Sequence, residues 1–117
     1  MLNRDALHAY CQSKPGATRE SPFGPNDTTY KVGGKIFAQI PTQEPLRVTV
    51  KCDPSLVPLL RSTYPAVQTA PYTNKNHWNN VLIDGSIPDD EVLEMIDNSY
   101  ALVVRGLSKA QREALKP

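Results

Sequence analysis

Apolar residues recur at spacings of three and four near both ends of the chain, which is typical of amphipathic helices. The N-terminal apolar pattern follows Asn3, a residue type that commonly caps helices, and stops before Lys14-Pro15-Gly16. The longer C-terminal apolar pattern follows Ser86-Ile87-Pro88-Asp89, a segment that fits a capping box. Its apolar positions are Val92, Ile96, Tyr100, Val103 and Leu107. These patterns predict one short and one long helix, each with a buried face.

Two further helices are predicted, one in the middle of the chain and one at its end. Asp53-Pro54 is typical of a helix start. Pro58 lacks a backbone N–H, so this helix is expected to start late or to bend there. Ser108 favours a last short basic helix. The apolar stripe of the middle helix is Leu56, Leu59, Leu60 and Tyr64.

The segment "TTYKVGGKIFAQI" alternates on both sides of Gly33-Gly34. Two glycines between alternating runs predict a β-hairpin with a two-residue turn. The simplest register places Val32 opposite Lys35 and Tyr30 opposite Phe37, with both aromatic rings on one face. We expect these rings to belong to the core rather than to a binding surface.

Two more segments, 46–52 and 77–84, alternate as half-buried strands do. The first has an apolar face and a face formed by Arg47, Thr49 and Lys51. In the second, Trp78, Asn80 and Leu82 are predicted to point one way, and His77, Asn79, Val81 and Ile83 the other. The order of elements indicates a single α+β domain over residues 1–117, with an antiparallel sheet covered by helices on one face.

Composition is that of one globular domain, with 117 residues, 39% hydrophobic and 21% charged. No apolar run approaches the roughly 20 residues of a membrane-spanning helix. The N-terminal residues lack the apolar segment and cleavage site of a signal peptide, so we expect a cytoplasmic protein. Cys11 and Cys52 form no CxxC pair and are expected to be free thiols.

Charge is unevenly distributed although the net charge is only +1. Residues 28–80 contain six basic and two acidic residues, whereas residues 84–97 contain six acidic residues and no basic one. Such segregation can build a basic face on a nearly neutral protein, and ordinary solvated surfaces are the alternative explanation. The acids at the start of the long helix suit its positive end and need no catalytic role.

Several motifs occur in an order and spacing that resemble the MmcQ/YjbR-like family of bacterial proteins. The most specific are Gly34-Lys35 with Phe37-Ala38, Lys51-Cys52-Asp53-Pro54, and Asn74-Lys75 with His77-Trp78. The resemblance extends from about Leu2 to Leu115. It implies the order α-β-β-β-α-β-β-α, in two layers like those of type III secretion chaperones. It also implies DNA binding, sometimes described as a double-wing motif.

Catalytic patterns are scarce in this chain. There is no GxSxG motif, and Cys52 lies on the apolar side of its strand, where a thiol is usually inert. His8, His77 and the two cysteines lack the spacing of metal ligands. Gly33-Gly34 is not followed by the helix that a phosphate-binding loop requires. We therefore expect no enzymatic activity, no metal and no cofactor.

Double-stranded DNA is the partner that the basic residues favour. Lysine and arginine side chains contact phosphates, and histidine and asparagine side chains suit bases or sugars. Trp78 is either a core anchor or part of this surface. The six candidate contacts are Lys35, Arg47, Lys51, Lys75, His77 and Asn79.

A protein-interaction module is the alternative, with an edge strand that accepts an extended partner segment, as in secretion chaperones. A continuous basic face would favour DNA, whereas an exposed apolar patch and a stable dimer would favour a protein partner. Neither reading involves a membrane, and no small-molecule substrate is indicated.

Overall fold

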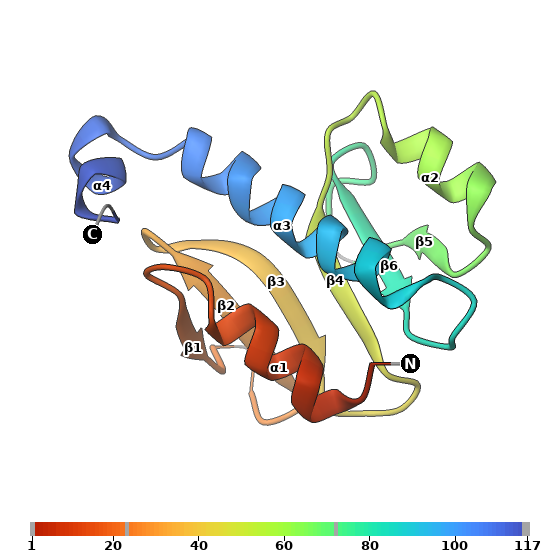
Figure 1. Ribbon diagram of the computed structural model, residues 1–117. Helices are drawn as coiled ribbons and strands as arrows, with labels where there is room; N and C mark the ends of the chain where they lie inside the picture. The colour runs from red at the N-terminus through yellow and green to blue at the C-terminus, as the bar shows by residue number, and fades with distance from the viewer. Residues whose placement is uncertain (1, 23, 72, 116–117) are drawn as a thin grey trace.

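The computed structural model describes residues 2–22, 24–71 and 73–115. Six strands form one antiparallel sheet in the order β1-β2-β3-β4-β6-β5, and helices pack on one face of it (Figure 1). The strands are β1 Thr18–Glu20, β2 Asp27–Val32, β3 Lys35–Pro41, β4 Arg47–Lys51, β5 Val67–Thr69 and β6 Trp78–Leu82. The helices are α1 Arg4–Gln12, α2 Val57–Thr63, α3 Asp89–Arg105 and α4 Lys109–Ala114. The predicted α+β class is confirmed.

Strand β1 was not expected from the sequence. Its three residues, Thr18, Arg19 and Glu20, are all exposed, so they carry no apolar alternation that would predict a strand. They pair with β2 at the edge of the sheet. The observed order therefore contains one strand more than the family resemblance implied, and α4 adds the last helix that Ser108 predicted.

The hairpin of β2 and β3 has the predicted turn but a different register. Val32 lies opposite Lys35, as expected, but the register then shifts and Tyr30 lies opposite Ala38. The predicted pairing of Tyr30 with Phe37 is therefore wrong by one residue. Both rings are fully buried with centroids 6.4 Å apart, so their place in the core is confirmed.

Ser99 of α3 fills the gap between β3 and β4. Its hydroxyl donates to the Phe37 carbonyl at 2.6 Å and accepts from the Lys51 amide at 2.8 Å. The β3–β4 ladder holds only two residue pairs, so these two backbone groups lack a strand partner at that point. One fully buried side chain thus satisfies both groups and fixes α3 on the sheet.

The helix starts follow local side-chain chemistry. Asn3 caps α1 and Ser108 caps α4, as predicted. Helix α2 begins late, at Val57, because Asp53 forms a turn with Ser55 instead of capping the helix. The capping box predicted for α3 is wrong, because the Ser86 hydroxyl donates to Asp84 instead.

Helix α1 is tied to α3 by a small polar cluster. The Tyr10 hydroxyl donates to Asp97 at 2.6 Å, and the ammonium of Lys14 forms an ion pair with the same carboxylate. That ammonium also lies 4.7 Å from the centre of the Tyr10 ring.

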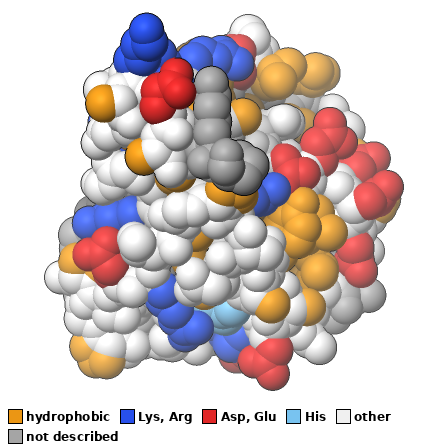
Figure 2. All heavy atoms as spheres, turned by 60° about the vertical axis from the view of Figure 1, so that its left-hand side comes forward, with side chains coloured by type: hydrophobic (Ala, Val, Ile, Leu, Met, Phe, Trp, Pro, Cys, Tyr) orange, Lys and Arg blue, Asp and Glu red, His pale blue; other side chains and the backbone are white. Residues whose placement is uncertain are grey.

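The surface in Figure 2 shows acidic side chains gathered mainly on one side of the view, apart from most basic ones. The expected segregation of charge is therefore visible on the folded surface.

The two cysteines are free and buried. Burial raises the pKa of Cys11 to about 12, with only a small opposing effect from Lys14. Burial also raises the pKa of the Cys52 thiol. Both thiols are therefore protonated at neutral pH, as expected for packing residues.

Candidate functional site

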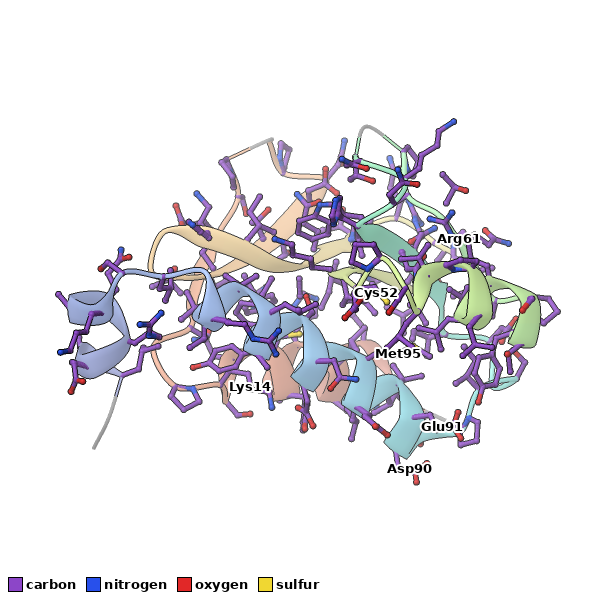
Figure 3. All side chains as sticks on the ribbon, turned by 90° about the horizontal axis from the view of Figure 1, so that it is seen from above. Lys14, Cys52, Arg61, Asp90, Glu91 and Met95 are labelled. Carbon is purple, nitrogen blue, oxygen red and sulfur yellow. The ribbon has the colours of Figure 1, made fainter. Side chains whose placement is uncertain are left out.

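The two faces of the sheet differ in what covers them. Residues directly opposite in an antiparallel pair point to the same side, and neighbours along a strand point to opposite sides. Val48, Val50 and Val81 are buried on the side of the helices. Their strand neighbours form what we call the open face, on which no described helix lies (Figure 3). The open face of β4 and β6 consists of Arg47, Thr49, Lys51, Trp78, Asn80 and Leu82.

Several predicted contacts meet at one corner of the open face. Lys51 lies directly opposite Trp78, which is half-buried. Lys75 is exposed and His77 half-buried in the loop that leads into β6. The His77 carbonyl accepts a hydrogen bond from the Cys52 amide at 2.7 Å, which joins this loop to the end of β4. Lys51 therefore lies across the ladder from Trp78, and Lys75 and His77 lie in the loop that leads directly into it.

Two of the predicted contacts lie elsewhere. Lys35 donates to the Gly106 carbonyl at 3.3 Å, at the end of α3 and thus on the helix side. Asn79 is only 1% exposed and points to the helix-covered face, where it accepts a hydrogen bond from Arg61. The continuous basic face that would favour DNA is therefore not formed by all four predicted cations, because strand alternation separates them.

Arg47 lies on the open face but is held by its own loop. Its guanidinium donates to the Pro45 carbonyl at 2.8 Å and to the Gln43 carbonyl at 3.4 Å. These bonds leave the positive charge in place, because the partners are neutral carbonyls. Arg47 therefore adds to the potential of this face at the far end of β4 from Lys51.

Arg61 is a residue whose role the sequence did not reveal. From α2, its side chain donates to Asn79 Oδ1 at 3.0 Å, to the Lys75 carbonyl at 2.7 Å and to the Trp78 carbonyl at 3.0 Å. Three bonds from one guanidinium fix the loop that carries Lys75. In the sequence Arg61 is one more polar residue on a helix, with no local signal that it reaches this loop.

The strands and the loop that form this corner carry no acidic residue. Strands β4 and β6 and residues 73–77 contain Arg47, Lys51 and Lys75 and no carboxylate. The centre of the face is polar, since Thr49 and Asn80 lie there and are almost fully buried. Asn80 Oδ1 has no hydrogen-bond partner among the described residues. The arrangement is a cationic, amide-rich surface with one aromatic ring, which suits phosphate and base contacts.

Other kinds of site receive no support from the described parts of the chain. Within residues 2–22, 24–71 and 73–115, no three His, Cys, Asp or Glu side chains are placed to share a metal ion. No helix in these ranges is both long and apolar enough to span a membrane.

The fold and this surface define a two-layer α+β protein with a partly basic sheet face on which no described helix lies. The chain belongs to the YjbR family, because the sequence profile of that family matches residues 12–102. Uncharacterized protein YjbR of Escherichia coli (strain K12) is 35% identical over 110 residues, which cover 93% of each chain. Uncharacterized protein YbdF of Escherichia coli O157:H7 is 33% identical over 100 residues, covering 82% of this chain and 80% of its own.

Solved structures agree with this family assignment. The Deinococcus radiodurans protein DR2400 superposes with a TM-score of 0.90 at 33% identity, covering 98% of this chain and 88% of its own. A Pseudomonas syringae protein superposes with a TM-score of 0.75 at 24% identity, covering 87% of this chain and 99% of its own. The second likeness shows a shared fold. None of these names states an activity, so function has to be argued from the open face.

Proposed function

We propose that this protein binds DNA through its open face, with Lys51 and Lys75 contacting phosphates on either side of Trp78. The observation that carries the proposal is that Lys51 lies opposite the half-buried Trp78, and that the exposed Lys75 lies in the loop before it, on a helix-free face whose strands contain no carboxylate. Binding to chromosomal DNA also implies a cytoplasmic protein.

Phosphate contacts of this kind give affinity without sequence preference. Each neutralised phosphate releases counterions, so the logarithm of affinity falls by about 0.9 per contact for each tenfold rise in salt. Three contacts, from Arg47, Lys51 and Lys75, correspond to a loss of about 40-fold between 50 and 200 mM salt. His77 lies next to Trp78, where it contacts the nucleic acid more locally. Arg61 acts as a positioning residue, because its bonds hold the Lys75 loop in place.

Trp78 is the chain's only tryptophan, so tryptophan fluorescence reports on DNA binding at this residue. Its fluorescence and the anisotropy of a labelled duplex are followed in one titration at two salt concentrations. The Lys51→Ala/Lys75→Ala double variant is expected to bind about tenfold or more weakly, with a salt slope reduced by about 1.8. Trp78 fluorescence of the parent protein is expected to change on binding.

The matched control is the Lys35→Ala/Lys109→Ala double variant, which removes the same charge away from the open face. Lys35 faces the end of α3, and Lys109 begins α4. Its affinity is expected to stay within about twofold of the parent. Absence of binding at low salt, or equal losses in the two double variants, would show that the open face is not a DNA interface.

A further inference from the structure

A cavity of about 230 Å³ lies on the opposite, helix-covered side of the sheet, between α2 and α3. Val50, Cys52 and Asn79 form its floor, and Leu60 and Met95 line opposite walls. Figure 3 shows Cys52 and Met95 in the space between these two helices. The two helices thus leave a mostly apolar hollow, of the kind that proteins use for small ligands.

The cavity opens to solvent beside apolar residues. Leu56, which lines it, is 42% exposed, and Leu59 on the neighbouring turn is 57% exposed. These are large hydrophobic side chains that folding has left partly in water, at an energetic cost that a bound apolar group would reduce. The apolar part of the cavity therefore favours a hydrocarbon chain or ring.

The floor of the cavity carries the polar side chain of Asn79. Asn79 uses its carbonyl oxygen to accept from Arg61 Nε, and the side chain is only 1% exposed. Its amide group can donate a hydrogen bond, so this part of the lining suits a ligand oxygen.

The rim of the cavity carries an available positive charge. The guanidinium of Arg105 lines the cavity, and it donates no hydrogen bond to any residue that the structure describes. Lys51 and Asp53 also line the cavity, so its charged residues are two cations and one carboxylate. The Asp53 carboxylate accepts from the Ser55 amide at 2.9 Å and hydroxyl at 2.8 Å. Those two bonds, more than the charge of Arg105, lower the pKa of Asp53.

We infer that this cavity binds a small amphipathic carboxylate, either a short-chain acid or an acid with a single aromatic ring. The apolar body lies against Leu60 and Met95, and Arg105 pairs with the carboxylate. The amide of Asn79 supplies a donor in the lining of the cavity. The volume lies below the roughly 300–1,000 Å³ of drug-sized sites, which excludes larger ligands. Lys51, a residue of the open face, also belongs to the lining, but the proposed ligand contacts use Arg105, Leu60 and Met95 and do not depend on DNA binding.

Met95 makes the inference testable by methyl NMR, because the chain has only two methionines. The protein is labelled with ¹³C-methyl methionine and titrated with hexanoate, phenylacetate, hexanol and hexylamine, in the absence of DNA. Hexanoate and phenylacetate are expected to shift the Met95 methyl signal saturably in the millimolar range. Hexanol is expected to bind at least fivefold more weakly, and hexylamine not at all.

Two variants test the charge of Arg105 and the volume of the cavity separately. Arg105→Gln removes the rim charge and is expected to weaken hexanoate binding at least fivefold. Ala101→Phe fills the cavity from an exposed position on α3 and is expected to abolish binding. Lys109→Gln and Ala110→Phe make the same changes at exposed positions of α4 and are expected to bind like the parent. Circular dichroism verifies that each variant is folded.

Specific outcomes would overturn the inference. Hexanol binding as tightly as hexanoate, or an unchanged affinity in Arg105→Gln, would exclude a carboxylate site. An unshifted Met95 signal, or hexanoate binding that survives Ala101→Phe, would exclude the cavity itself. Since DNA is not present, none of these outcomes bears on the open face.

Discussion

Two neighbouring asparagines of β6 point to opposite faces of the sheet and differ in whether their side-chain oxygen has a hydrogen-bond partner. Asn79 points to the helix-covered face, where Arg61 donates to its carbonyl oxygen. Asn80 points to the open face, where its carbonyl oxygen has no partner among the described residues. Both are almost fully buried. The difference shows that the elements packed on each face, and not the residue type, decide whether a buried amide stabilises the fold.

The largest effect is expected at Ser99, on the helix-covered face. Ser99→Ala leaves the Phe37 carbonyl and the Lys51 amide without their partner, which is expected to lower the free energy of unfolding by about 2–4 kcal/mol. Urea denaturation measures this change. The control is Ser62→Ala, a change at an exposed helical serine, with an effect within about 0.5 kcal/mol. Equal losses in the two variants would show that Ser99 does not bridge the strands.

The asparagine pair gives the next largest effect and tests the comparison directly. Asn79→Ala leaves Arg61 Nε without its acceptor and is expected to cost about 2 kcal/mol in unfolding free energy. Asn80→Ala removes an oxygen that has no partner and is expected to change stability by less than about 0.5 kcal/mol. Denaturation of both variants under the same conditions measures the difference. If Asn80→Ala is the more damaging change, the contrast between the faces is wrong.

A smaller, pH-dependent effect is expected where α1 meets α3. Burial tends to raise the pKa of Asp97, but the hydrogen bonds from Lys14 and Tyr10 outweigh it, so this pKa lies below its ordinary value of 3.8. The ionised carboxylate therefore stabilises the fold at neutral pH. That contribution is lost as the pH falls below about 3.8 and through the folded-state pKa.

Asp97→Asn tests this contribution. Because the ion pair is partly exposed, the variant is expected to lose only about 0.5–1 kcal/mol at neutral pH, and less in acid. Glu94→Gln, at an exposed acid of the same helix, is the control and is expected to have a smaller effect. A loss in Asp97→Asn that stays constant down to pH 2 would contradict the assignment.

The smallest effect is expected at His8, also on the helix-covered side. Burial lowers its pKa below the ordinary 6.5, and the positive charges of Arg19 and Arg4 lower it further, against an opposing effect of Asp5. The unfolded chain therefore takes up a proton more readily, and stability decreases as the pH falls through about 6.5. The His8 titration followed by NMR is expected to have its midpoint below 6.5.

His8→Gln provides the matching stability measurement. Its unfolding free energy is expected to depend less on pH between about 5 and 7 than that of the parent. The loss of the contact between His8 Nδ1 and the Tyr30 hydroxyl, 2.8 Å in the parent, adds a decrease in stability at neutral pH. A His8 midpoint above 6.5 would reverse the expected sign.

Local signals predicted the parts of the fold that depend on neighbours in the chain. Asn3 and Ser108 cap helices as expected, because a cap needs only a side chain and the amides that follow it. Gly33-Gly34 forms the predicted turn, since both residues adopt positive φ angles that glycine tolerates. The shifted register beyond that turn was missed. The residue of β3 left without a partner is Phe37, whose carbonyl accepts from Ser99, 62 residues further along the chain.

For the candidate DNA contacts too, the sequence predicted some features and only the tertiary structure decided the others. Side chains of a strand point alternately to its two faces. This alternation alone predicted that Arg47 and Lys51 point to one face of their strand, and that Asn79 and Asn80 point to opposite faces of theirs. Only the tertiary structure decided which side the helices cover. In the folded chain Asn79 is buried, Lys35 donates to a carbonyl at the end of α3, and Arg61 donates to the Lys75 carbonyl. These outcomes depend on contacts between distant segments, and such contacts leave no signal in the local order of residues.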